Sequence, residues 1–253
     1  MVNLIGGGSV DPGGISESAA GATIQYSGSG NVTLDDAGSY TGTTTVKTGV
    51  QVNASDGAAF GTDAAGTTVE DGGSINFTGG TYTETFNITG NGLGTGEGQV
   101  EGAMKKSAGS NVIFQGLITV AADSRIYSAG NELFIDGGLN VNGNTLTLDA
   151  QNRINIRSTS VSGGGLVRVE GNDLVDIEVS NTNYSGDFEL FNDGQIDLHA
   201  DNALGDHNGT TTVLGSNTNI GLRNGRTHRS NFVIEGGKNN WGAFINWNGS
   251  STI

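Results

Sequence analysis

Short runs of alternating apolar and polar residues follow one another along the whole chain. Such runs occupy residues 31–34, 85–88, 145–148 and 195–198, and turn-forming Gly, Asn, Asp or Ser residues follow them. A period of two gives one buried and one solvated face, which predicts β-strands. Roughly twenty strands of this kind succeed one another at intervals of about 8–12 residues, a spacing typical of all-β proteins.

Two all-β architectures compete for this pattern. A sandwich or barrel needs longer strands and more aromatic side chains, whereas a β-solenoid needs short strands, a narrow core and tight corners. The chain matches the solenoid, with roughly 20–25 residues per coil and about ten to twelve coils. We expect the solenoid to span residues 26–253, with Ile154 and Ile156 facing its core. Residues 1–25, rich in Gly and including Pro12, are expected to be a connector or cap.

A long internal repeat supports the solenoid. The segment that begins Tyr40-Thr41-Gly42 reappears further along the chain, beginning at Tyr184. The same offset relates three further pairs of segments: 51–53 and 195–197, 59–61 and 203–205, and 67–69 and 211–213. The repeat therefore lies near residues 40–88 and 184–234, and it predicts that several coils form one larger unit.

Residues 39–52, completed by Ala59-Phe60-Gly61, resemble the passenger-associated repeat of bacterial autotransporters, and residues 184–205 form a second copy. This resemblance implies a right-handed parallel β-helix within an extracellular fibre or adhesin. The tail fibres and spikes of viruses use similar solenoids rich in Gly, Asn and Thr, which gives a second resemblance.

Composition narrows the function. The chain has 253 residues, with 45 Gly, one Pro, no Cys and a net charge of −15. So much Gly argues against a helical bundle. The negative charge argues against nucleic acid as a partner, because such binding depends on neutralising phosphates. No apolar run approaches the roughly 20 residues of a membrane span, and residues 1–8 do not resemble a signal peptide.

No motif for catalysis, a cofactor or a metal stands out. Asp187 and Glu189 would share one face of a strand, about 6.5–7 Å apart, which suits a glycosidase, but a solvated acidic face is the favoured interpretation. Residues 171–174 resemble one calcium-binding turn without the repeats that such sites need. Lys105 and Lys106 fall in the one segment with helical character, residues 100–108, and are expected in a solvated loop.

Two groups of residues are candidates for binding. Arg223, Arg226 and Arg229 lie within seven positions and form either a surface loop or a docking patch for an anionic surface. Trp241 and Trp247 would share one face of a strand. These tryptophans either stack on sugar rings or, as Trp residues more often do, pack against the core.

Three functions follow as hypotheses. The first is a non-catalytic structural or adhesive β-helix in an extracellular surface fibre or adhesin, with a glycan or host-cell receptor as partner. The second is a virion tail fibre or spike for host attachment, associating as a homotrimer. The third is a carbohydrate-active enzyme that uses the acidic residues and the arginine cluster. The first two place the chain outside the cell, on a cell surface or on a virion, and self-association into a fibre is compatible with both.

Overall fold

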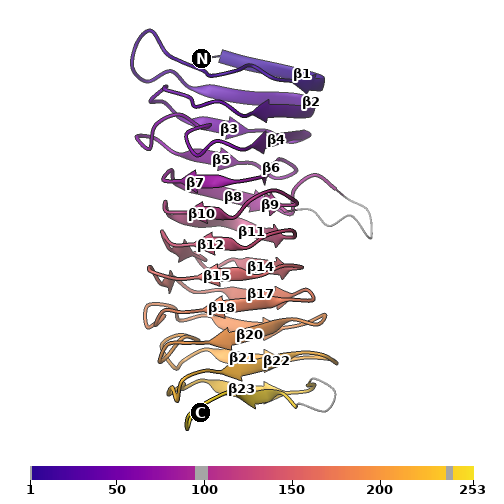
Figure 1. Cartoon of the computed structure of the whole chain (residues 1–253), viewed down its shortest axis with the longest axis vertical. Helices are drawn as coiled ribbons and strands as arrows, with labels where there is room; N and C mark the ends of the chain where they lie inside the picture. Colours follow the sequence, from indigo (N-terminus) through magenta and orange to yellow (C-terminus); the bar gives the residue numbers. More distant parts are fainter. Residues whose placement is uncertain (1, 95–101, 238–241) are drawn as a thin grey trace.

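The computed structural model describes residues 2–94, 102–237 and 242–253, and the side chains from residue 11 onward within those ranges. Every regular element in these ranges is a β-strand. The strands stack into a parallel β-solenoid of about 10 turns, with the two termini at opposite ends of the stack (Figure 1). The all-β solenoid expected from the alternation of residues, and the parallel β-helix implied by the family resemblance, are therefore confirmed.

Most strands are short, as the spacing of turn residues predicts, and only three exceed six residues within the described part of the chain. In chain order the strands are β1 (Val2–Val10), β2 (Ile24–Leu34), β3 (Thr44–Val46), β4 (Val50–Ala54), β5 (Thr67–Val69), β6 (Ser74–Phe77), β7 (Gly80–Tyr82), β8 (Phe86–Gly90), β9 (Met104–Lys106), β10 (Val112–Phe114), β11 (Ile118–Ser128), β12 (Leu133–Ile135), β13 (Leu139–Asn140), β14 (Thr145–Ala150), β15 (Ile154–Ile156), β16 (Val161–Ser162), β17 (Leu166–Glu170), β18 (Leu174–Ile177), β19 (Asp187–Leu190), β20 (Gln195–Leu198), β21 (Thr210–Val213), β22 (Asn219–Leu222), β23 (Asn231–Ile234) and β24 (Phe244–Asn246).

The strands form one 16-stranded and one 8-stranded sheet in the described residues. The smaller sheet has the order β24-β22-β20-β18-β15-β12-β10-β7, and its neighbours all pair in parallel. Leu133, Ile154, Val175, Ile196 and Ile220 occupy equivalent positions on five successive strands. The interval between each of these residues and the next is one turn of the solenoid, and it falls within the range expected from the sequence.

The larger sheet bends around a corner of the rod. The first residues of β2 pair with β3, and residues 30–34 of the same strand pair with β4. β11 likewise pairs with β8 through its first half and with β14 through its second half. The 16-stranded sheet thus supplies two faces of the rod, and the 8-stranded sheet supplies the third.

The core is a narrow column of inward-facing side chains. Strand alternation places Ile, Val, Leu and Phe residues inside, including Ile154 and Ile156, both fully buried as expected. One part of the column is aromatic. Phe77 packs against Phe60, Tyr82, Phe86 and Phe114, with ring centroids 4.8 to 6.2 Å apart.

The two copies of the internal repeat have the same local geometry. Tyr40 and Tyr184 are both fully buried. Gly61 and Gly205 both have positive φ, and a Cβ on either would lie 2.5 to 2.6 Å from the carbonyl oxygen of the corresponding tyrosine. The sequence repeat that begins at Tyr40 and Tyr184 is therefore also a repeat of the corner structure.

The segment expected to be a connector or cap, residues 1–25, contains strand β1, which pairs with β2 over residues 2–10.

One segment differs from the sequence-based expectations. Lys105 and Lys106 lie in strand β9 and are buried, so the expected helical, solvated segment is wrong. β9 is held between β6 and β11, and this pairing over long sequence separation overrides local preference. Burial lowers the pKa of Lys106, whose Nζ donates a hydrogen bond to the Ala108 carbonyl oxygen.

Glycine is required where one coil passes close to the next. A Cβ on Gly137 would lie 2.1 Å from the Gln115 carbonyl oxygen, a distance that real Cβ atoms do not reach. We expect Gly137→Ala to lower the free energy of unfolding by about 1–3 kcal/mol through overpacking. Gly164→Ala is the matched control, because its nearest neighbour would be Ser185 Oγ at 3.4 Å. Equal urea midpoints for the two variants would contradict this explanation.

Candidate binding groove on the eight-stranded sheet

Outward-facing residues of the 8-stranded sheet form three parallel columns, because register pairs like positions on successive coils. The first column contains Leu174, Gln195 and Asn219. The second lies two residues further along each strand and contains Asn155, Asp176, Asp197, Gly221 and Ile245. The third, two residues further again, contains His199, Arg223 and Trp247. Alternate residues of each strand thus line up with those of the next strand and together form one continuous surface.

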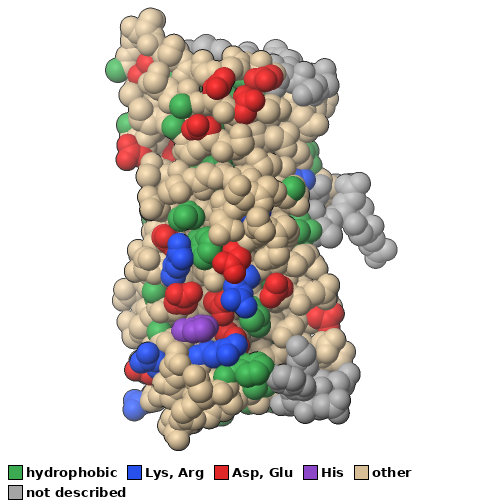
Figure 2. Space-filling model, in the orientation of Figure 1, with side chains coloured by type: hydrophobic (Ala, Val, Ile, Leu, Met, Phe, Trp, Pro, Cys, Tyr) green, Lys and Arg blue, Asp and Glu red, His purple; other side chains and the backbone are tan. Residues whose placement is uncertain are grey.

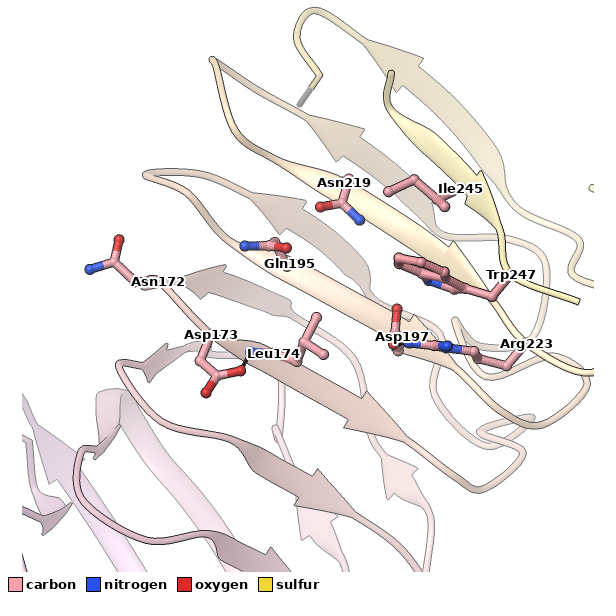
Figure 3. Close-up of a pocket in the computed structure, with 9 residues that line it drawn as sticks. All are labelled: Asn172, Asp173, Leu174, Gln195, Asp197, Asn219, Arg223, Ile245 and Trp247. Atoms are coloured by element: carbon pink, nitrogen blue, oxygen red, sulfur yellow. Dashed lines mark hydrogen bonds and ion pairs between the residues drawn. The ribbon is translucent and has the colours of Figure 1, made fainter. Parts of the chain in front are cut away.

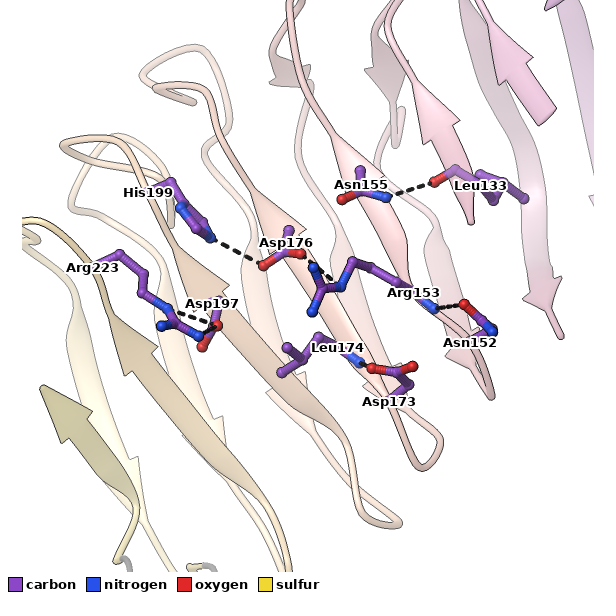
Figure 4. Close-up of polar contacts among 10 residues, drawn as sticks. All are labelled: Leu133, Asn152, Arg153, Asn155, Asp173, Leu174, Asp176, Asp197, His199 and Arg223. Carbon is purple, nitrogen blue, oxygen red and sulfur yellow. Dashed lines mark hydrogen bonds and ion pairs between the residues drawn. The ribbon is translucent and has the colours of Figure 1, made fainter. Parts of the chain in front are cut away.

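Two buried carboxylates lie next to each other in the second column, and an arginine side chain pairs with each of them. Asp176 and Asp197 are register partners and would repel each other if both were unpaired. Arg153 Nε lies 3.1 Å from Asp176 Oδ2, and Arg223 Nε donates to Asp197 Oδ2 at 2.8 Å (Figure 4). His199 Nε2 lies 3.1 Å from Asp176 Oδ1. Figure 2 shows acidic and basic side chains interspersed over this lower half of the rod.

Asp176, Asp197 and His199 have the residue types of a metal site. Each has a ligand atom, and these atoms all lie within 4.8 Å of one another. A divalent cation prefers carboxylates with uncompensated charge. Here Arg153 and Arg223 already hold the two carboxylates, and their positive charges would repel a cation. The arrangement therefore fits an ion-pair network better than a metal centre.

A shallow groove crosses β18, β20, β22 and β24 beside this network (Figure 3). Its volume is about 340 Å³, within the range of small-ligand pockets. The residues that line it are Asn172, Asp173, Leu174, Gln195, Asp197, Asn219, Arg223, Ile245 and Trp247.

Two acceptor atoms in the groove lack hydrogen-bond partners within the described part of the chain. Asp197 is 1% exposed and Asn219 is 2% exposed, and the Oδ1 atom of each has no partner. An unpaired buried acceptor costs about 1–3 kcal/mol, so folded proteins usually satisfy such atoms. Both atoms belong to residues that line one groove, which makes the groove a candidate for binding a hydrogen-bond donor.

Trp247 forms the aromatic wall of the groove. It is 42% exposed, and the Arg223 guanidinium lies 4.5 Å from its ring centroid, a cation–π contact. Gly221 makes room for this arrangement. A Cβ at Gly221 would lie 1.8 Å from Asp197 Oδ1 and 2.7 Å from Trp247 Nε1.

The structure brings together only part of the predicted binding set. Arg223 and Trp247, which lie on successive coils, meet in the groove, but Arg226 and Arg229 are not among its lining residues. Arg229 is exposed, whereas Arg226 is half-buried and its Nε is buried without a hydrogen-bond partner in the described ranges. Trp241 lies outside the described residues. Of the three arginines, only Arg223 lines the described groove.

His228 lies between Arg226 and Arg229 in the sequence and is fully buried. Both of its ring nitrogens lack hydrogen-bond partners within the described residues. Burial lowers the pKa of His228 to about 4, so the ring is neutral at physiological pH. It therefore adds no positive charge to the arginines around it.

Sequence reasoning missed the polar members of the groove. Asn172, Gln195, Asp197 and Asn219 come from three successive coils, and only coil stacking places them together. The coil length was the signal in the sequence that could have identified these neighbours. A shift of one coil along the chain aligns Asp176 with Asp197, and a second shift aligns Asp197 with Gly221.

The acidic pair considered for catalysis is engaged between coils. Asp187 Oδ1 accepts a hydrogen bond from the Thr210 backbone N–H at 2.7 Å. Glu189 Oε1 accepts one from Arg168 Nε at 2.6 Å. Both carboxylates therefore join their coil to a neighbour, where a solvated acidic face was expected.

Glu84 is a carboxylic acid with a strongly altered acidity. It is buried inside the rod, where its Oε1 accepts a hydrogen bond from Thr67 Oγ1 at 2.6 Å. Burial raises the pKa of Glu84 to about 8, against the lowering effect of the Thr67 hydrogen bond. A raised carboxyl pKa is typical of catalytic acids. This one faces the core, so we interpret it as a structural group that folds in its protonated form.

Glu84 predicts a pH dependence of stability. Between pH 4.5 and about 8 the unfolded chain ionises this group while the folded rod keeps it protonated, so stability falls as pH rises. The slope from this residue approaches about 1.4 kcal/mol per pH unit. We expect Glu84→Gln, which retains the hydrogen bond to Thr67, to remove that slope from urea unfolding curves recorded at pH 5 and pH 8. Parallel pH profiles for variant and parent would contradict the assignment.

Within the described residues, no helix has the length and apolar character needed to cross a membrane. Comparison with known proteins matches the chain to no protein-family model, no curated protein and no solved structure.

Proposed function

We propose that the chain is a non-catalytic structural β-helix of an extracellular surface fibre or adhesin, which carries a binding groove on its side. The observation that supports this proposal is the use of charged side chains to join coils. Arg125 Nη1 lies 2.6 Å from Asp149 and also contacts Glu170 two coils away. Arg157 Nε donates to Asp136 at 2.6 Å while its guanidinium stacks 3.9 Å from the Phe134 ring centroid.

Such pairs reinforce a rod. Single surface ion pairs contribute about 0.2–1 kcal/mol, but networks along a stack contribute more. Three of these pairs join residues 21 to 24 positions apart and so link neighbouring coils, and the Arg125–Glu170 pair spans 45 positions and two coils. Parallel backbone pairing from β1 to β24 continues the same connection. A stack with contacts between neighbouring coils is rigid and extensible, which suits a spacer that holds a binding surface away from its anchor.

The experiment that tests this proposal has two parts. Size-exclusion chromatography with light scattering, followed by electron microscopy, measures mass and shape, and a monomeric rod is expected. Beads coated with the chain are then mixed with cells that display surface glycans, and adhesion above uncoated beads is expected. The absence of adhesion would contradict the adhesive part of the proposal.

Two other outcomes would favour the competing functions. An elongated trimer would favour a virion fibre, because such fibres associate as three chains in that hypothesis. Release of new reducing ends from a panel of neutral and acidic polysaccharides would show a carbohydrate-active enzyme and contradict a non-catalytic role.

A further inference from the structure

We propose that the groove lined by Asp197, Asn219 and Trp247 binds an uncharged saccharide. This inference rests on the proposed adhesive function, and it names the ligand class and the residues that recognise it. The three residues come from successive coils, with Asp197 in β20, Asn219 in β22 and Trp247 directly after β24.

The two unpaired oxygens determine the polarity of the ligand. Asp197 Oδ1 and Asn219 Oδ1 are acceptors that the lining side chains cover, so a ligand that reaches them must shift that cover and present hydrogen-bond donors. Hydroxyl groups of a sugar, or the N–H of an acetamido group, meet this requirement. Pairing these buried atoms removes a cost that the folded chain otherwise carries, and that gain favours the bound state.

Charge in the groove favours a neutral ligand. The Asp197 carboxylate is paired with Arg223, so this pair presents no net charge to a ligand. Asp173 adds a further acidic group to the lining, and the whole chain has a net charge of −15. Sulfated or uronic acid sugars would therefore be repelled, and their acceptor oxygens would face other acceptors.

The apolar part of the groove suits the face of a sugar ring. Trp247, Ile245 and Leu174 supply apolar surface, whereas Asn172 and Gln195 are polar (Figure 3). A pyranose ring has C–H groups on its faces and hydroxyls around its edge, which matches this separation. The Arg223 contact fixes the orientation of the indole before a ligand arrives, so less freedom is lost on binding. A volume of about 340 Å³ lies at the small end of ligand pockets, which favours one or two sugar units.

The test is binding to an array of neutral oligosaccharides, built from hexoses and N-acetylhexosamines, together with sulfated and uronic acid oligosaccharides. We expect the chain to bind neutral probes, and titration calorimetry then gives Kd for the best neutral probe. Trp247→Ala should raise that Kd about tenfold or more, the cost expected of a central aromatic contact. Phe191→Ala is the matched control, because Phe191 is 40% exposed but lies outside the groove, and its Kd should equal that of the parent.

Asn219→Ala separates binding from folding. Removing an unpaired buried acceptor should leave the melting temperature unchanged or raise it, while the Kd rises about tenfold or more. A purely structural Asn219 would instead show a lower melting temperature and an unchanged Kd.

Other results would overturn the inference. Binding to acidic oligosaccharides alone, or to an arginine-rich peptide in place of neutral sugars, would assign the groove to another ligand class. Neutral binding that survives both Trp247→Ala and Asn219→Ala would place the site elsewhere and leave the adhesive function standing. Cell adhesion without any saccharide binding would overturn this inference alone, whereas a chain that neither adheres nor binds sugars would also contradict the proposed function.

Discussion

Ile154→Asp is expected to abolish the cooperative unfolding transition of the rod or to lower its stability by more than about 4 kcal/mol. Ile154 is fully buried, and its register neighbours Leu133 and Val175 are also fully buried and apolar. The substitution removes about 1.5–3 kcal/mol of apolar burial and also places a carboxylate in that environment. We expect a lower urea midpoint of unfolding, measured by circular dichroism.

The control for this prediction is Asn87→Asp, which adds the same charge at an exposed position of strand β8. We expect this control to change stability by less than about 0.5 kcal/mol. Hydrogen exchange adds a spatial test, because contacts in a solenoid are limited to neighbouring coils. In the Ile154→Asp variant, β12, β15 and β18 should exchange first. An unchanged midpoint in both Ile154→Asp and Ile156→Asp would show that this strand does not face the core.

Phe77→Ala has the second largest expected effect, a loss of about 3–5 kcal/mol. Phe77 is fully buried at the end of β6, and its ring centroid lies 4.8 Å from those of both Tyr82 and Phe114. It also contacts Phe60 and Phe86, which lie on preceding and following coils. Its removal leaves a cavity surrounded by rings that belong to several coils, and rigid coils can close such a cavity only in part.

Phe191→Ala provides the comparison for Phe77, because it deletes the same atoms from a site that is 40% exposed. The expected change is below about 1 kcal/mol. Thermal and urea unfolding measure both variants. Similar losses of unfolding free energy for Phe77→Ala and Phe191→Ala would show that the aromatic cluster around Phe77 is not a main source of stability.

The solenoid could be predicted because its signals are local. A period of two appears within single strands such as residues 145–148, and glycines appear at the corners between strands. The repeat that begins at Tyr40 and Tyr184 is equally visible, since both copies need the same buried ring and the same glycine corner. Coil length followed from the spacing of these signals.

Local signals failed where pairing over long sequence separation decided the outcome. Lys105 and Lys106 have no strand preference, yet β9 is extended because Met104 pairs with both Ile75 and Ile126. Glu84 shows the same effect for a carboxylic acid. Alternation placed a carboxyl inside, and the Thr67 hydroxyl of a neighbouring strand made burial acceptable by donating to it.

The sequence by itself determined that this protein is a stack of short parallel strands with an apolar interior, because alternation and turn residues act over a few positions. Only the tertiary structure decided which surface residues meet. Arg223 finds Asp197 and Trp247 through the register of successive coils, and a different coil length would separate them. The groove therefore depends on stacking distances that no single segment encodes, since side chains a full coil apart along the chain become neighbours only after the backbone has paired.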